Sequence, residues 1–252
     1  MALRPVIDEA GEKFRAIISE RNLGNEVVQV KIGTLTVKQA IGSPIRQDYP
    51  LIEGREVMIE AEFQSSFGQA FTDRPSNFNG SINEVLDLDM SISDNRAVYI
   101  ATLNAVMSHL GMVTGVRHCH DEEPEECAMQ MARHIIGESG RLRVGMIGLQ
   151  PAILENLVKT FGSENIRCTD LNSKNVGTRK YGAEIWDGRT DTGRIIDWSE
   201  LLLVTSSTIV NNTYDDIREK ASSRGRRLIN FGVTGAGVSA LLDLKRLCFQ
   251  PH

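Results

Sequence analysis

Apolar residues recur at two different spacings along the chain, and the spacing changes near its middle. Residues 1–21 carry apolar side chains at helical spacing, which predicts an amphipathic helix. Residues 26–32 and 56–63 are rich in β-branched and other apolar side chains and predict strands. Residues 94–110 and 122–136 return to the helical period and predict two long helices. The first half is therefore mixed α and β, with no repeat.

The second half alternates short apolar runs, which predict strands, with amphipathic segments, which predict helices. The predicted strands are 142–148, 165–171, 183–186, 201–205 and 227–232, and the predicted helices are 151–161, 236–244 and one that follows Thr213 and ends at Ser222. Such alternation implies parallel pairing with right-handed crossovers. We predict an α/β protein with an α+β domain at residues 1–90 and a Rossmann-like domain at residues 91–252. The helix from Asp94 is expected to pack on the second sheet.

Polar loops follow the predicted parallel strands, and open α/β sheets bind ligands at that edge. The loops are rich in Gly, Ser, Thr and Asn, and they begin at Gly148, Asp170, Thr205 and Phe231. We predict that Gly148, Asp170, Thr205, Ser206, Asn211 and Gly235 contact a ligand. Asp170 follows Gly148 at about the ~20-residue interval at which a dinucleotide fold places its ribose-binding acid.

Conventional NAD binding is nevertheless not expected. Residues 145–151 contain no G-x-G-x-x-G, and Pro151 has no backbone N–H where a phosphate would bind. Residues 234–237 before the last helix fit an anion site on backbone amides, and they fit a turn and helix start equally well. No P-loop, nucleophile elbow or H-E-x-x-H motif is present.

Residues 117–127 hold two histidines, two cysteines and five carboxylates. One interpretation is a helix start, in which Asp121 caps the helix and Pro124 occupies its first turn. The other is a metal site, because thiolate and imidazole suit a transition-metal ion such as zinc or iron. The candidate ligands are His118, Cys119, His120 and Cys127. The spacing of the two cysteines matches no standard zinc motif, and both interpretations stay open.

Residues 65–75 also have two interpretations. Gly68 and the small polar residues around it suggest either a surface turn or a loop that contacts a ligand.

Composition limits the partners and the compartment. The net charge of −5 argues against nucleic acid as the main partner, since phosphate binding needs a basic surface. No run reaches the roughly 18–20 apolar residues of a membrane span, and residues 1–21 lack the apolar core of a signal peptide. Four scattered cysteines predict free thiols in a reducing cytoplasm. A homo-oligomer is compatible with this composition.

Four segments together resemble the putative heavy-metal chelation family; they are residues 67–72, 101–106, 144–148 and 203–213. The resemblance covers nearly the whole chain. It implies an N-terminal half like the enolase N-terminal domain, a Rossmann-like C-terminal half, and a site in the cleft between them. It supports as cleft residues Gly68, Thr72, Asn104, Thr205 and Asn211. A metal role for residues 118–127 rests on side-chain chemistry alone, and a shared fold does not transfer a reaction.

Three functions follow from these observations. The first is a cytoplasmic protein that binds a metal ion or a metal-bearing small molecule in the interdomain cleft. The second is an enzyme that uses a nucleotide-like adenosyl ligand on the Rossmann-like half, with His118 or Cys119 as a catalytic group. The third is a binding module with structural thiols. The sequence alone does not decide whether any reaction is catalysed.

Overall fold

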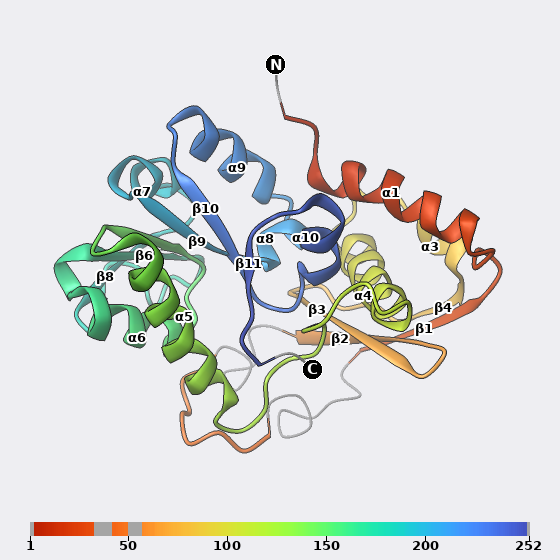
Figure 1. Ribbon diagram of the computed structural model, residues 1–252, viewed down its shortest axis with the longest axis horizontal. Helices are drawn as coiled ribbons and strands as arrows, with labels where there is room; N and C mark the ends of the chain where they lie inside the picture. The colour runs from red at the N-terminus through yellow and green to blue at the C-terminus, as the bar shows by residue number, and fades with distance from the viewer. Residues whose placement is uncertain (1–2, 33–41, 50–56, 251–252) are drawn as a thin grey trace.

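The computed structural model describes residues 3–32, 42–49 and 57–250 of the chain. These residues form two separate sheets with helices packed around them (Figure 1). The strands that begin at Val27 and Val144 lie in different sheets, as predicted. Among the described residues, no helix combines the length and the apolar composition needed to cross a bilayer.

The first sheet has four antiparallel strands in the order β3-β2-β1-β4. Its strands and associated helices are α1 (Val6–Glu20), β1 (Val27–Ile32), β2 (Val57–Phe63), β3 (Ser66–Thr72), β4 (Phe78–Ser81), α3 (Ile82–Leu86) and α4 (Ser93–His109). The predicted first helix is confirmed, and its apolar stripe is buried. Residues 65–75 were predicted to be a surface turn or a loop, and Ser66–Thr72 is instead a strand that pairs with β2 over its whole length. Ligand contact by this segment stays a prediction.

The second sheet has seven strands in the order β11-β10-β9-β5-β6-β8-β7, all parallel except β7. Its elements are α5 (Glu123–Ser139), β5 (Val144–Ile147), α6 (Pro151–Phe161), β6 (Ile166–Asp170), β7 (Arg179–Lys180), β8 (Ala183–Asp187), α7 (Thr192–Trp198), β9 (Leu201–Thr205), α8 (Ser207–Val210), α9 (Tyr214–Ser223), β10 (Arg227–Phe231), α10 (Ala236–Leu242) and β11 (Arg246–Leu247). Helices α5 and α6 pack together on one face, and α7 and α9 on the other (Figure 1). The predicted α/β fold class with a parallel sheet is confirmed.

Helix α4 joins the two sheets. Every residue from Arg96 to Met107 is buried, so the helix has no solvent face and must be covered on all sides. It packs mainly on β2 and β3, and it also contacts α8 and α10. The prediction that the helix from Asp94 packs on the second sheet is therefore wrong. The domain boundary at residue 90 stays a prediction, as does the likeness of the first sheet to the enolase N-terminal domain.

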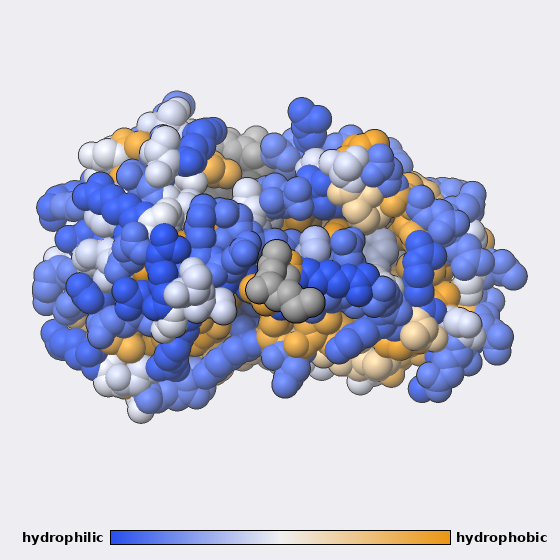
Figure 2. Space-filling view, turned by 90° about the horizontal axis from the view of Figure 1, so that it is seen from above, coloured by the Kyte–Doolittle hydropathy of each residue, from blue (hydrophilic) through white to orange (hydrophobic). Residues whose placement is uncertain are grey.

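The surface seen in Figure 2 is mostly hydrophilic, and hydrophobic side chains show through in scattered patches. The apolar side chains gather instead in two buried clusters. One contains α1, α4 and the first sheet together with the face of the second sheet that meets them. The other lies between the second sheet and α5 and α6. The first cluster therefore holds the two sheets in one body.

Candidate functional site

A cavity of about 1070 Å³ lies at the carboxyl ends of the parallel strands. The residues after β5, β6, β9 and β10 line it from the second sheet, and the end of β3 lines it from the first. Open α/β sheets bind ligands at this edge, in the crevice where the strand order reverses direction. Here the reversal falls between the neighbouring strands β5 and β9.

Gly148 and Thr205 meet at this reversal, one after each strand. Gly148 has a φ of +89°, and a Cβ there would lie 2.3 Å from Cγ2 of Thr205. Only glycine allows the backbone to take this conformation and to approach the threonine so closely. Both residues line the cavity, as the sequence predicts for this edge.

Hydroxyl groups cover the sheet side of the cavity. Ser206 donates a hydrogen bond to the carbonyl of Phe231 over 2.8 Å, so its hydroxyl is already used within the chain. Thr205 Oγ1 lies 3.4 Å from Ser207 Oγ, a long contact that leaves room for a stronger partner. Thr169 on β6 is 1% exposed, and its hydroxyl has no partner within the described residues. Asn211 also lines the cavity and is exposed.

Asp170 stands at the end of β6 and lines the cavity. One carboxylate oxygen accepts the backbone N–H of Asn172 over 3.1 Å, and the other accepts the side-chain amide of Asn175. The carboxylate therefore fixes its own loop, and both oxygens have an internal partner before any ribose-like diol arrives.

The first sheet and the segment before α5 supply the opposite wall, with Thr72, Phe71 and His118. The backbone N–H of His118 donates to Oε1 of buried Gln69 over 2.7 Å, and its ring packs edge-on against Phe71. Nδ1 lies 2.7 Å from the carbonyl oxygen of Cys119, which places the hydrogen on Nδ1 and leaves a lone pair on Nε2. Desolvation lowers the pKa of His118, so the ring is neutral at neutral pH.

Three thiols occupy one rim of the cavity: Cys119, Cys127 and Cys248. Interaction with Cys119 lowers the pKa of Cys127, and interaction with Cys127 together with burial raises the pKa of Cys119. Cys119 Sγ and Cys248 Sγ lie 3.9 Å and 3.8 Å from the same carbonyl oxygen, that of Gln250. All three are free thiols.

Four predicted site residues lie outside the cavity lining: Gly68, Asn104, His120 and Gly235. Gly68 packs β3 against α4, where a Cβ would lie 2.2 Å from the backbone nitrogen of Ala105. Asn104 is fully buried, and its side-chain amide forms hydrogen bonds with backbone groups. A Cβ on Gly235 would lie 2.7 Å from the hydroxyl of Ser206, so this glycine allows close packing behind the cavity. The structure therefore gives Gly68, Asn104 and Gly235 packing roles.

Residues 131–243 match the family model described as putative heavy-metal chelation. The C-terminal part of the chain matches the putative heavy-metal chelation family. The match runs from within α5 to just past α10, and it therefore includes Thr169, Asp170 and the hydroxyl loop after β9. The resemblance inferred from the sequence is confirmed for this part of the chain, and the first sheet lies outside the match.

Two solved structures described as DUF364 proteins are similar to this chain. A DUF364 protein of unknown function from Pyrococcus horikoshii has a TM-score of 0.52 and 16% identity, over 91% of this chain and 79% of that chain. A second, from Desulfitobacterium hafniense, has a TM-score of 0.47 and 11% identity, over 74% of this chain and 72% of that chain. No curated protein sequence matches the chain. The first likeness supports a two-domain α/β fold and nothing about activity.

The family description raises the question of whether the cavity residues fit a metal. Thiolate sulfur and neutral imidazole suit a soft or borderline ion. Cys119 and Cys127 supply two adjacent donors, and both line the cavity with His118. Across residues 3–32, 42–49 and 57–250, however, no three His, Cys, Asp or Glu side chains form a metal-binding group. The thiols and the neutral imidazole therefore have suitable chemistry, but the described residues show no complete ligand set.

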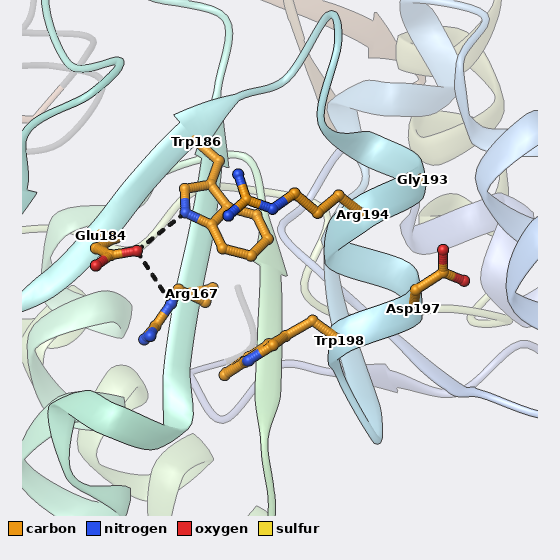
Figure 3. A pocket seen from close by; sticks show the side chains of 7 residues that line it. All are labelled: Arg167, Glu184, Trp186, Gly193, Arg194, Asp197 and Trp198. Carbon is orange, nitrogen blue, oxygen red and sulfur yellow. Dashed lines mark hydrogen bonds and ion pairs between the residues drawn. The ribbon is translucent and has the colours of Figure 1, made fainter.

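A second hollow lies over β6, β8 and α7 (Figure 3). The guanidinium of Arg194 covers the ring of Trp186 at 3.8 Å, and Glu184 bonds both to Trp186 and to Arg167. Arg167 also lies over Trp198 at 5.0 Å. The aromatic faces and charges of this hollow are engaged with each other, so we regard the cavity at the carboxyl ends as the candidate site.

The sequence did not predict two of the residues that shape this site. Cys248 follows β11, a two-residue strand, and only the fold brings it beside Cys119. Thr169 lies inside an apolar strand, where a threonine is unremarkable until its unpaired hydroxyl is seen. The sequence could have indicated Thr169, because this residue immediately precedes the predicted site residue Asp170. Nothing in the sequence indicates Cys248.

Proposed function

We propose that the protein binds a polar small molecule that carries a soft or borderline metal ion, in the cavity at the carboxyl ends of the parallel strands. The observation that carries the proposal is that the thiols of Cys119 and Cys127 line the same cavity as Thr205, whose hydroxyl has only a long contact of 3.4 Å to Ser207. A hydroxyl with so long a contact gains a stronger hydrogen bond from a polar ligand. The thiols provide the contact to the metal.

The size of the cavity supports a metal complex over a bare ion. A volume of about 1070 Å³ is that of a small-molecule pocket, whereas an ion held by protein ligands alone needs donors around a single point. In this proposal Cys119 and Cys127 contact the metal, with His118 beside them. His120 was a predicted ligand and has no place in the lining, so we do not carry it forward.

The hydroxyl side would hold the organic part of the ligand. Thr205 and Asn211 stand at the centre of the sheet edge and line the cavity, while Ser206 supports the loop from behind. Ligation by thiols requires them to be reduced, which is the physical reason for placing the protein in the cytoplasm. In the same proposal the ligand lies between an enolase-like unit and a Rossmann-like unit that share one apolar core.

A thermal-shift panel tests the proposal. Zn²⁺, Co²⁺ and Ni²⁺ are each added alone and together with citrate as a chelating acid, and the melting temperature is recorded. We expect a larger rise with the complex than with the ion alone, and loss of that rise in Thr205→Val and Asn211→Ala. Asn156→Ala is the control, because that side chain bonds the carbonyl of Ala152 in its own helix. An equal rise in all variants would place the ligand elsewhere.

A nucleotide-like ligand is the second candidate, supported by the place of Asp170 in the cavity. Both of its carboxylate oxygens already accept hydrogen bonds within the loop, so this candidate ranks below the first. Adenosine nucleotides and an adenosyl sulfonium compound in the same panel separate the two. Stabilisation by them without metal would favour the nucleotide.

A further inference from the structure

Basic side chains line the part of the cavity that is formed by β6, β7, β8 and the loops that follow them. Lys174 lies in the loop after β6, Lys180 lies on β7, and Arg189 lies in the loop after β8. Within residues 3–32, 42–49 and 57–250, neither Lys174 nor Lys180 has an ion-pair partner. Both ammonium groups are therefore available to a ligand.

Hydrogen bonds hold the loops after β6 and β8 together. The carboxylate of Asp170 accepts two hydrogen bonds within the loop after β6, on either side of Lys174. Nη1 of Arg189 donates to the carbonyl oxygen of Leu171 over 2.7 Å, and the backbone N–H of Gly188 donates to the carbonyl oxygen of Asp170 over 2.9 Å. Lys174 and Arg189 therefore stand on two loops that are fixed to each other.

The carboxylates of the cavity lining leave this side positively charged. Between Ile166 and Thr192 the lining includes three cations and one carboxylate, that of Asp170. Both oxygens of Asp170 already accept hydrogen bonds from its own loop. Asp48 lies beside Arg46, and Asp216 pairs with Lys220 over 2.6 Å. The remaining lining carboxylate, Asp73, follows β3 on the wall from the first sheet.

We propose that this side of the cavity binds a small anion that carries at least two oxyanion groups, either carboxylate or phosphate. A guanidinium and an ammonium on adjacent loops suit two such groups, and a cleft lined by one sign of charge concentrates ions of the opposite sign. The hydroxyls of Ser173 and Thr190 line the same part and offer further donors. The inference rests on the cavity of the proposed function and names the class of its organic ligand, but it does not require a metal.

Isothermal titration calorimetry of the full chain tests the anion site. Protein and buffer are freed of metal with a chelating resin, and citrate or pyrophosphate is titrated into the protein in Tris buffer of low ionic strength. We expect both anions to bind and neutral glycerol not to bind. Lys174→Gln and Arg189→Gln should each lower the affinity about tenfold, because each removes a hydrogen bond to a charged group.

Lys31→Gln is the matched control, because Lys31 is exposed on β1 and lies outside the cavity lining. The proposal is wrong if wild-type protein binds neither anion, if Lys174→Gln and Arg189→Gln bind as tightly as wild type, or if Lys31→Gln weakens binding equally. The tighter anion assigns the ligand to the carboxylate or the phosphate class.

Salt gives a second measurement that needs no variant. The affinity of wild-type protein should fall as sodium chloride is added, because salt screens exposed charges. An affinity that does not change with salt would place the anion away from these cations. The result is separate from that for the metal: anion binding by wild-type protein that holds no metal would support this inference and contradict the metal in the proposed function. Retained metal without anion binding would do the reverse.

Discussion

Asn104 ties the two sheets together through one buried amide. Its nitrogen donates to the carbonyl of Gln69 on β3 over 2.9 Å and lies 3.2 Å and 3.1 Å from the carbonyls of Val233 and Thr234. Its oxygen accepts the backbone N–H of Gly237 over 2.8 Å. One side chain therefore satisfies backbone groups on both sides of the molecule, next to the wall of the cavity.

We predict that Asn104→Ala destabilises the protein by about 3 kcal/mol, because it leaves several buried backbone groups without a partner and each costs about 1–3 kcal/mol. Unfolding in urea, followed by circular dichroism, measures the change. Asn156→Ala removes a hydrogen bond within one partly buried helix and should cost much less. Similar losses in the two variants would mean that Asn104 does not join the sheets.

Among the elements, β3 and α4 pack with almost no space between their backbones. A Cβ at Gly68 would lie 2.2 Å from the nitrogen of Ala105 and 2.5 Å from the oxygen of Ala101, and backbone cannot move aside as a flexible side chain can. We predict that Gly68→Ala lowers the free energy of unfolding by about 1–3 kcal/mol through overpacking.

Gly137 in α5 is the matched control for Gly68. A Cβ there meets no atom within 4 Å, and glycine inside a helix is less stable than alanine by about 0.5–1 kcal/mol. Gly137→Ala should therefore stabilise the protein. Urea unfolding of both variants gives the sign of each change in the free energy of unfolding. Stabilisation by Gly68→Ala would contradict the close packing of β3 on α4.

The segment 42–49 is attached to α5 and α6 by Arg46. Its guanidinium bonds Glu125 on α5 and Glu155 on α6, and it donates to the hydroxyl of Tyr181 over 2.6 Å. The side chain is only 15% exposed, so these charge-assisted bonds are weakly screened. They hold the segment against the helices that cover one face of the second sheet.

We predict that Arg46→Met costs about 1–2 kcal/mol at neutral pH. Lys159 and then Arg46 lower the pKa of Glu155 from 4.5, so the carboxylate contributes stability above that pH and loses it as pH falls through the lower, folded value. The difference between wild type and variant should therefore shrink in acid. Melting curves from pH 7 to pH 3 measure it. A stability difference that stays constant with pH would show that Glu155 does not contribute to it. Arg4→Met, which removes an exposed ion pair, serves as the control.

Sequence periodicity predicted the elements whose pattern is local. The helices at 6–20 and 151–161 and the strands at 166–170 and 201–205 have apolar spacings that do not depend on distant residues. Periodicity did not predict strand β3, because its small and polar residues are buried by α4. The sequence does not show that α4 lies beside this strand. The predicted parallel sheet placed the loops of the site at one edge. The position of Cys248 could not be predicted, because it depends on how the C-terminal strand adds to the sheet.

For the whole molecule, one apolar cluster spans both sheets. It joins α1, α4 and the first sheet to Ile147, Val204 and Val238 from the second part of the chain. A boundary near residue 90 would cut through this cluster, because α4 packs on the first sheet and contacts α8 and α10 as well. We expect two units that share a core to unfold together.

We therefore predict a single unfolding transition. Trp186 and Trp198 both lie in the second part of the chain, so their fluorescence reports on that part, while far-ultraviolet circular dichroism reports on all of it. The two signals should share one midpoint in urea. Midpoints that differ, with fluorescence and dichroism changing separately, would show that the two parts are independent domains.

The central claim is that the cavity thiols hold a metal-bearing ligand. Its most direct test is the metal content per chain, by elemental analysis, of protein purified without oxygen. Wild-type protein and Cys168→Ser should retain a soft or borderline divalent metal, since the Cys168 thiol is buried in the sheet away from the cavity lining. The double variant Cys119→Ser with Cys127→Ser should lose it. Equal metal content in all three proteins would contradict the account.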